Sequence, residues 1–178
     1  MTTLTEWTLA ALLHFARPEL QDRNPWADPT AEAARERYQG IAETIAAECA
    51  DVKAKRSCAA LLAAIAIGES GLARDADLGP CYRQGAYRTR CDSGAAASVW
   101  QVHAHGFDAR GEDITIARIF SDRALAAWLV HRIARGSLAR CSHLPEEDRL
   151  AGLGGNCTPS ASARARWKLW KRIEGWAP

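Results

Sequence analysis

The sequence has no apolar run long enough to cross a lipid bilayer and no large excess of charge of one sign. Its longest apolar stretches, residues 9–15 and 59–67, fall short of the roughly 20 residues that a membrane-spanning helix needs. The 23 lysines and arginines nearly balance 21 aspartates and glutamates, for a formal net charge of +2. This balance argues against a general nucleic-acid binder, so any polyanionic ligand would have to meet a local cluster of basic residues.

A secretory leader, internal repeats and low-complexity segments are also missing. The first residues, Met-Thr-Thr-Leu-Thr-Glu, lack the basic segment and the small-residue cleavage site of a signal peptide, so we expect a mature form or another export route. With 178 residues, 48% of them apolar, the chain has the size of one domain that can bury a core.

Alternating runs of β-branched and aromatic residues, typical of strands, are scarce, and the periodic segments have the helical period. The sequence therefore predicts a mainly α fold in a single domain. We expect Thr30 and Ser57 to be helix N-caps and Gly136 to follow a helix end. Residues 75–94, rich in Gly, Arg and Asp, are expected to form a long loop or short hairpin. The expected helices cover residues 4–16, 30–49, 57 to near 71, 114–135 with a break near 121–122, and 158–175.

Six cysteines are many for a reduced cytosolic domain of this length, and their spacings match neither a zinc site nor a thioredoxin motif. We therefore predict disulfides and an extracytoplasmic location. Six cysteines allow 15 connectivities, and proximity along the chain favours Cys49–Cys58, Cys81–Cys91 and Cys141–Cys157. The alternative is a set of six buried free thiols.

Glu69 is the strongest candidate for a chemical role. It ends the apolar run 61–68 and is followed at once by Ser-Gly. Burial against aliphatic side chains and the negative end of a helix dipole both favour a protonated carboxyl group, which can act as a general acid. The alternative is that Glu69 is simply the first solvated residue where a core helix emerges.

Three segments, in the same order, resemble the lysozyme-like superfamily of goose-type lysozymes and soluble lytic transglycosylases. Ile65-Ala-Ile-Gly-Glu-Ser-Gly71 is similar to the catalytic-glutamate segment. Ser93-Gly-Ala-Ala-Ala-Ser-Val-Trp-Gln-Val102 is similar to the Gly-Leu-Met-Gln-Ile segment, with Trp100 at the family methionine and Gln101 at the glutamine. Ile119-Phe-Ser-Asp122 and the helix after it resemble the Leu-Phe-Asp-Pro stretch.

The resemblance covers about residues 57–157 and implies a lysozyme-like helical domain. Residues 1–56 would form N-terminal helices, 57–157 the catalytic core and 158–178 a C-terminal helix. The implied activity is muramidase or lytic transglycosylase cleavage of the β-1,4 bond between N-acetylmuramic acid and N-acetylglucosamine, with Glu69 as general acid/base. The implied partner is the peptidoglycan glycan strand, bound by a monomer without a cofactor. The alternative is a non-catalytic glycan-binding or structural module.

The resemblance also implies substrate-binding residues around Glu69, namely Ser70, Ser98, Trp100 and Gln101. The family's Ala-Tyr-Asn-Ala-Gly segment has no tyrosine here, where residues 150–156 read Leu-Ala-Gly-Leu-Gly-Gly-Asn. We expect a tyrosine of the long loop to supply the missing hydroxyl group. The candidates for it are Tyr82 and Tyr87.

Some goose-type lysozymes use an aspartate to direct water, and three aspartates in and near the loop are candidates for this second carboxylate: Asp75, Asp77 and Asp92. The alternative for each of them is an ordinary turn former or helix cap. His103 and His105 could line the cleft, but two histidines without a third nearby ligand do not indicate a zinc site, so we predict no metal. In residues 158–178, tryptophans alternate with basic residues, which fits either inward packing or an anionic polymer.

Overall fold

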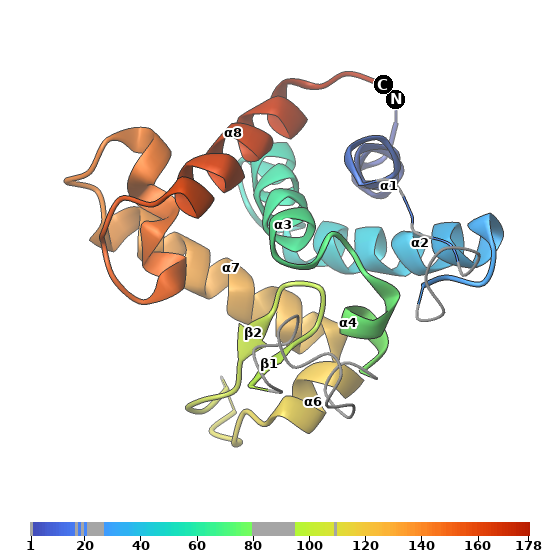
Figure 1. Ribbon diagram of the computed structural model, residues 1–178, viewed down its shortest axis with the longest axis horizontal. Helices are drawn as coiled ribbons and strands as arrows, with labels where there is room; N and C mark the ends of the chain where they lie inside the picture. Colours follow the sequence, from blue (N-terminus) through green and yellow to red (C-terminus); the bar gives the residue numbers. More distant parts are fainter. Residues whose placement is uncertain (1, 17, 19, 21–26, 80–94, 109) are drawn as a thin grey trace.

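The fold consists mainly of α-helices arranged around one central helix (Figure 1). The computed structural model describes residues 2–16, 18, 20, 27–79, 95–108 and 110–178. The elements in chain order are α1 (Leu4–Phe15), α2 (Ala31–Glu48), α3 (Lys55–Ser70), α4 (Arg74–Leu78), β1 (Ala96–Ala97), β2 (Val102–His103), α6 (Ile116–Ser121), α7 (Arg123–Arg140), the 3-10 segment η3 (Glu146–Gly154) and α8 (Ala161–Gly175). The predicted mainly α fold is thus confirmed.

Side chains that cap helices set several boundaries. The Thr30 hydroxyl accepts a hydrogen bond from the Ala33 N–H, as expected, and the Asp122 carboxylate accepts one from Leu125 N–H. Asp122 therefore caps the start of α7 and accounts for the predicted break between α6 and α7. Ser160, whose hydroxyl accepts from Ala163 N–H, begins α8.

Three predicted helix boundaries, two starts and one end, are wrong. The expected cap Ser57 lies inside α3, which begins at Lys55 without a side-chain cap. Thr158 precedes α8, because its N–H donates to the Asn156 side chain in a turn before the helix. Gly136 lies inside α7, which continues to Arg140.

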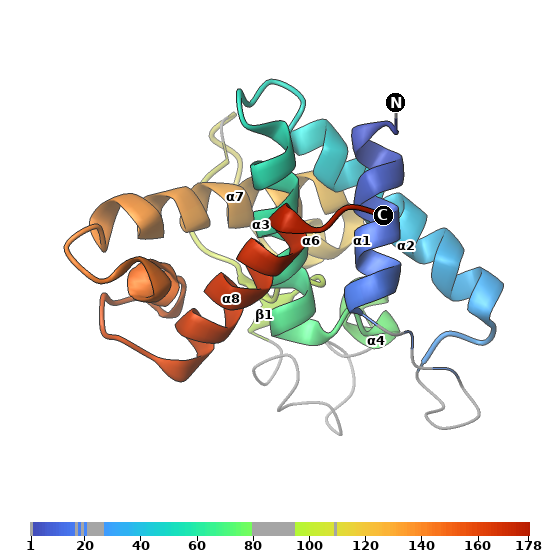
Figure 2. The ribbon, with the colours of Figure 1, turned by 90° about the horizontal axis from the view of Figure 1, so that it is seen from above.

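Helix α3 is the centre of the core, and α1, α2, α7 and α8 all pack against it. Figure 2 shows α8 crossing α3 on one side, with α7 on another. The close approach of these helices depends on small residues, because α3 carries five fully buried alanines that hold neighbours at short distance. These are Ala59, Ala60, Ala63, Ala64 and Ala66.

The tryptophans of α8 support inward packing. Trp170 and Ile173 are buried, and the Trp170 indole N–H donates to the Ser57 carbonyl oxygen at 3.1 Å. The Trp167 ring contacts the Trp170 ring edge to face. These contacts fix α8 along α3, so the position of any α8 side chain that faces α3 is well defined.

Part of the predicted loop 75–94 is a helix. Asp75 and Asp77 lie on α4 and are buried rather than exposed in a loop. The Asp77 carboxylate pairs with Arg37 at 3.4 Å and with Arg123 at 2.9 Å, so it joins α4 to both α2 and α7. The loop prediction failed here because charged residues without apolar periodicity give no helical signal.

Two of the predicted disulfides, Cys49–Cys58 and Cys141–Cys157, are present. The first joins the end of α2 to α3, and the second closes the chain around η3. Cys81 and Cys91 lie outside the described residues. Within the described ranges, no helix is both long enough and apolar enough to cross a membrane.

A two-stranded antiparallel hairpin leads into the functional region. Ala96 pairs with His103 and Ala97 with Val102. The sequence did not predict it, because two residues per strand are too few to show a period of two.

Candidate active site

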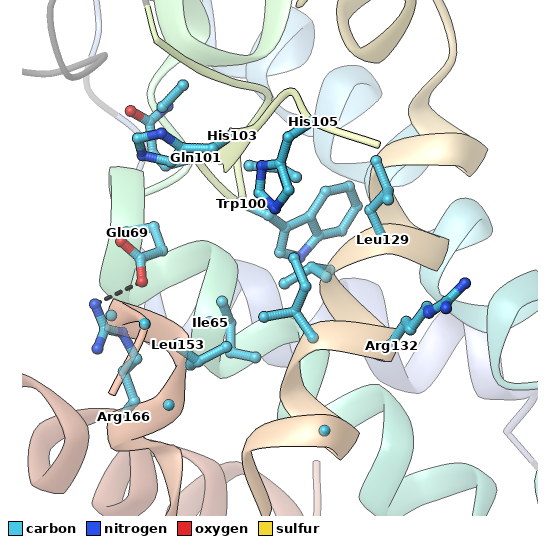
Figure 3. Close-up of a pocket in the computed structure, with 18 of the residues that line it drawn as sticks. Ile65, Glu69, Trp100, Gln101, His103, His105, Leu129, Arg132, Leu153 and Arg166 are labelled. Carbon is cyan, nitrogen blue, oxygen red and sulfur yellow. Dashed lines mark ion pairs between the residues drawn. The ribbon is translucent and has the colours of Figure 1, made fainter. Parts of the chain in front are cut away.

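A cleft of about 1200 Å³ opens beside the C-terminal end of α3. Four further parts of the chain form its walls: the hairpin with the loop after it, α7, the end of η3 and the start of α8 (Figure 3). Its lining residues are Ile65, Glu69, Ala96, Trp100–His103, His105–Phe107, Ile114, Trp128–Val130, Arg132, Ile133, Gly136, Arg140, Ala151–Gly155, Ser160, Ser162 and Arg166. A cleft of this size accommodates several sugar-sized groups.

Glu69 lies in the last turn of α3 and faces this cleft. Its helix ends at Gly71, whose φ of 62° is the left-handed conformation that glycine adopts at little cost and that closes a helix. The Glu69 side chain is 22% exposed. Burial raises the pKa of Glu69 above its ordinary value, although Arg166 and His103 oppose this by favouring the carboxylate.

Arg166 is the direct partner of Glu69. Its Nη2 lies 2.5 Å from Glu69 Oε1 (Figure 3), and its Nε is buried without a hydrogen-bond partner among the described residues. The stem of Arg166 crosses α3 at Gly68, where a Cβ atom would lie 3.3 Å from Arg166 Cγ. The sequence analysis missed this contact because an arginine on the last helix looks like part of a solvated basic face.

The hairpin presents Gln101 to the same cleft. Gln101 has a backbone φ of 50° and Ser98 a φ of 66°, values that residues other than glycine rarely adopt. The Gln101 N–H and side-chain amide both donate to the Ser98 carbonyl oxygen, which holds this tight turn. Backbone conformations of this kind persist where the surrounding contacts impose them, and they concentrate at functional sites.

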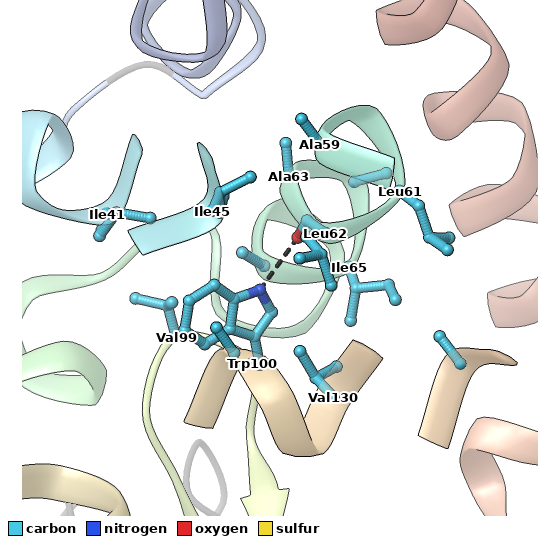
Figure 4. Close-up of a cluster of buried hydrophobic side chains, with 14 of the residues drawn as sticks. Ile41, Ile45, Ala59, Leu61, Leu62, Ala63, Ile65, Val99, Trp100 and Val130 are labelled. Carbon is cyan, nitrogen blue, oxygen red and sulfur yellow. Dashed lines mark hydrogen bonds between the residues drawn. The ribbon is translucent and has the colours of Figure 1, made fainter. Parts of the chain in front are cut away.

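Trp100 anchors the turn to α3. Its indole N–H donates to the Leu62 carbonyl oxygen at 3.0 Å, and its ring lies among apolar side chains (Figure 4). Trp100 is 2% exposed, yet it contributes to the cleft lining. Its main role in the structure is therefore to hold Gln101 at a fixed distance from α3.

Ser70 and Ser98 do not line the cleft. The Ser70 hydroxyl donates to the Val99 carbonyl oxygen at 2.8 Å and accepts from Leu72 N–H. Ser98 is buried, and its hydroxyl accepts from Trp100 N–H. Ser70 thus ties the end of α3 to the hairpin, Ser98 stabilises the turn of the hairpin, and both hydroxyl groups are engaged within the protein.

His103 and His105 line the cleft on the hairpin side and are exposed. No group of three metal-ligating side chains is found in the part of the chain that the structure describes. Of the two histidines, His103 acts on Glu69 electrostatically and favours its carboxylate form.

The expected second carboxylates are not gathered around Glu69. Asp75 and Asp77 are buried outside the cleft lining, and Asp77 is held by two arginines. Asp92 and both candidate tyrosines, Tyr82 and Tyr87, lie outside the described residues. Among the described lining residues, Glu69 is the one carboxylate.

Several lining residues were not identified from the sequence. Phe107 is 65% exposed at the cleft, and Trp128 lies on α7 with the Arg132 guanidinium over its ring. Arg140 donates to the Gly152 carbonyl oxygen and so holds the end of η3 against α7. Of these residues, Phe107 could have been identified from the sequence, because it is a large aromatic residue in the polar segment Gly-Phe-Asp-Ala-Arg-Gly.

The chain was compared with known proteins, and no protein-family model, curated protein or solved structure matches it. The functional argument therefore stands on the residues and on the geometry of the cleft.

Proposed function

We propose that the protein cleaves peptidoglycan at the β-1,4 bond between N-acetylmuramic acid and N-acetylglucosamine, as a muramidase or lytic transglycosylase, with Glu69 as general acid/base. The observation that carries this proposal is the position of Glu69. It is a partly buried carboxyl group with a raised pKa in a large cleft, and Gln101 lines the same cleft. This is the arrangement that the sequence resemblance implies.

The chemistry requires a proton on the oxygen that leaves the sugar ring. Protonated Glu69 donates it as the bond to the anomeric carbon breaks, and becomes a carboxylate. The carbonyl oxygen of the substrate's own acetamido group bonds to the anomeric carbon in its place. The second nucleophile is either water or the 6-hydroxyl group of the same ring. Its oxygen bonds to the anomeric carbon as the bond from the acetamido oxygen breaks, and Glu69 accepts its proton.

The shortage of carboxylates supports this internal nucleophile. A glycosidase that relies on two carboxyl groups places both beside the scissile bond. The described lining offers Glu69 alone, and the buried Asp77 is committed to Arg37 and Arg123. An acetamido group on the substrate makes a second protein carboxylate unnecessary.

The rest of the cleft suits a carboxylate-bearing glycan. Phe107 and Trp128 offer aromatic surface, and Arg132 and Arg140 add positive charge along α7. Peptidoglycan carries lactyl and peptide carboxylates beside its sugar rings. Because peptidoglycan is extracytoplasmic, we also place the protein there, in the periplasm, outside the cell, or delivered by a phage or secretion apparatus. The two disulfides are compatible with this.

The alternative is a non-catalytic glycan-binding or structural module. One observation favours it: Arg166 holds Glu69 in an ion pair, and an ionised glutamate cannot donate a proton.

Mass spectrometry of the soluble products from purified cell walls separates the two functions. An enzyme releases muropeptides that end in a reducing sugar if water is the second nucleophile, or in an anhydro sugar, lighter by one water, if the 6-hydroxyl group is. A binding module sediments with the walls and releases neither product, which would refute the proposed activity.

A further inference from the structure

We propose that Arg166 is a carboxylate-binding residue that couples substrate recognition to the protonation of Glu69: a carboxylate on the glycan takes the guanidinium from Glu69, which then takes up a proton from solvent. This inference rests on the proposed function, because it concerns how that same site becomes active.

The free protein presents a conflict that the substrate has to resolve. A general acid must be protonated, but the Arg166 Nη2 lies 2.5 Å from Glu69 Oε1 and stabilises the ionised form. Both side chains line the cleft. The reaction needs Glu69 free of Arg166, but the ion pair holds them together. A bound ligand must therefore compete with Glu69 for the Arg166 guanidinium.

Arg166 has an unused donor for such a ligand. Its Nε is buried and has no hydrogen-bond partner among the described residues, which is costly for a charged donor. A guanidinium binds a carboxylate best through two parallel N–H groups, and Nε forms one such pair with an adjacent Nη. Because Nε lies against Gly68 of α3, a ligand carboxylate pairs with this edge as the guanidinium turns away from Glu69. The new pair would satisfy Nε and draw positive charge away from Glu69.

The stem of Arg166 is held while its charged end lies in the cleft. Gly68 has no side chain, so Arg166 Cγ packs directly on α3. A Cβ atom at position 68 would lie only 3.3 Å from Arg166 Cγ. Trp170 and Ile173 fix α8 against α3. A ligand can therefore redirect the guanidinium without moving the helix that carries it.

The charges around Glu69 determine the direction of the effect. Arg166 faces it from α8 and His103 from β2, while Arg132 and Arg140 of α7 line the same cleft. Within the described lining no other carboxylate competes for Arg166. When Arg166 is engaged elsewhere, burial dominates and the pKa of Glu69 rises further, so carboxylate binding is accompanied by proton uptake.

The test measures proton uptake on binding of two matched ligands. The first is the disaccharide N-acetylglucosaminyl-N-acetylmuramic acid, and the second is its methyl ester, which has the same rings without the charge. Titration calorimetry in buffers of different ionisation enthalpy counts the protons. We choose a pH just above the pKa of Glu69, determined by NMR of its carboxyl carbon in the free protein.

The wild type is expected to take up a proton, up to one per site, with the acid and much less with the ester. Arg166→Gln should raise the pKa of Glu69 in the free protein and abolish the difference between the ligands. Arg166→Lys, which keeps the charge but not Nε, should leave the pKa of Glu69 close to its wild-type value and lose most of the preference for the acid. Lys168→Gln, which removes an exposed cation from the same helix, should behave as wild type.

Equal proton uptake with both ligands, or no binding of the acid, overturns the inference. The two ligands are compared on the wild type, so this result does not depend on whether an Arg166 variant folds. The proposed function fails separately: a protein that releases no muropeptides but takes up a proton only with the acid has the carboxylate site without the enzyme. If the protein cleaves cell walls but takes up protons equally with the acid and the ester, the proposed enzymatic function stands and the proposed coupling is refuted.

Discussion

Phe107 is a large apolar side chain that the protein leaves 65% exposed at the edge of the cleft. The residue after it is held by hydrogen bonds: the Asp108 carboxylate accepts from Arg110 N–H, Glu112 N–H and the Arg118 guanidinium. Arg118 lowers the pKa of Asp108 to about 2, so this carboxylate remains ionised. An exposed aromatic ring at the edge of a cleft is a typical binding surface.

Phe107→Ala should raise the Michaelis constant for glycan strands several-fold, because the ring no longer packs on the bound polymer. Stability should change by less than about 0.5 kcal/mol, since the side chain is mostly exposed. The matched control is Leu78→Ala, which removes an apolar side chain that is 50% exposed but lies outside the cleft lining. Equal Michaelis constants for both variants would show that Phe107 does not contact substrate.

The sequence reveals the candidate acid but not the residues that it contacts. Glu69 was identified from its place at the end of an apolar run, because that pattern is local. Its partner Arg166 is 97 positions away by residue number, and only the packing of α8 on α3 brings the two together. Asp77 was misinterpreted for the same reason, since Arg37 and Arg123 reach it from helices distant in the sequence.

At the scale of elements, the end of η3 and the residue that caps it form a wall of the cleft through Ala151–Gly155. The Cys141–Cys157 disulfide closes the chain around this wall with a sequence separation of 16. Gly152 permits the close packing with α7, because a Cβ atom there would lie 2.6 Å from Ser137 Oγ and 2.8 Å from Arg140 Nη2. The wall thus depends on one disulfide and one glycine.

Replacing both Cys141 and Cys157 by serine should lower the free energy of unfolding by about 3 kcal/mol, through the greater entropy of the unfolded chain. The same variant should raise the Michaelis constant, because η3 is less constrained. The double serine variant of Cys49 and Cys58 is the control, with a similar loss in denaturant unfolding but an unchanged Michaelis constant. A rise in both variants, or in neither, would contradict a specific role of the Cys141–Cys157 disulfide in the wall.

Long elements were predictable and short ones were not. α1, α2 and α7 have apolar periodicity over three or more turns, and caps such as Thr30 mark where they begin. α4, the hairpin and η3 are short or irregular, so periodicity does not reveal them. These unpredicted elements include the hairpin and η3, which carry Gln101, His103 and the glycine-rich wall of the cleft.

In the whole molecule, the buried alanine-rich helix α3 positions the candidate acid. α1, α2, α7 and α8 surround it, and Trp100 attaches the hairpin to it through the Leu62 carbonyl oxygen. Glu69, in the last turn of α3, is thereby held in the cleft. The assembly explains how a chain of nearly balanced charge can present a cleft whose described lining has Arg132, Arg140 and Arg166 against one carboxylate.

The most direct test of the account is the rate at which Glu69→Gln clears a suspension of purified cell walls. Glutamine can still accept a hydrogen bond from Arg166, so the melting temperature should remain within a few degrees of wild type. It cannot donate the proton that bond cleavage needs, and the clearance rate should fall by about 10²–10⁴-fold. Glu36→Gln, an exposed carboxylate on α2, should clear the walls at the wild-type rate. Clearance by the Glu69 variant at the wild-type rate would contradict the assignment of Glu69 as the general acid.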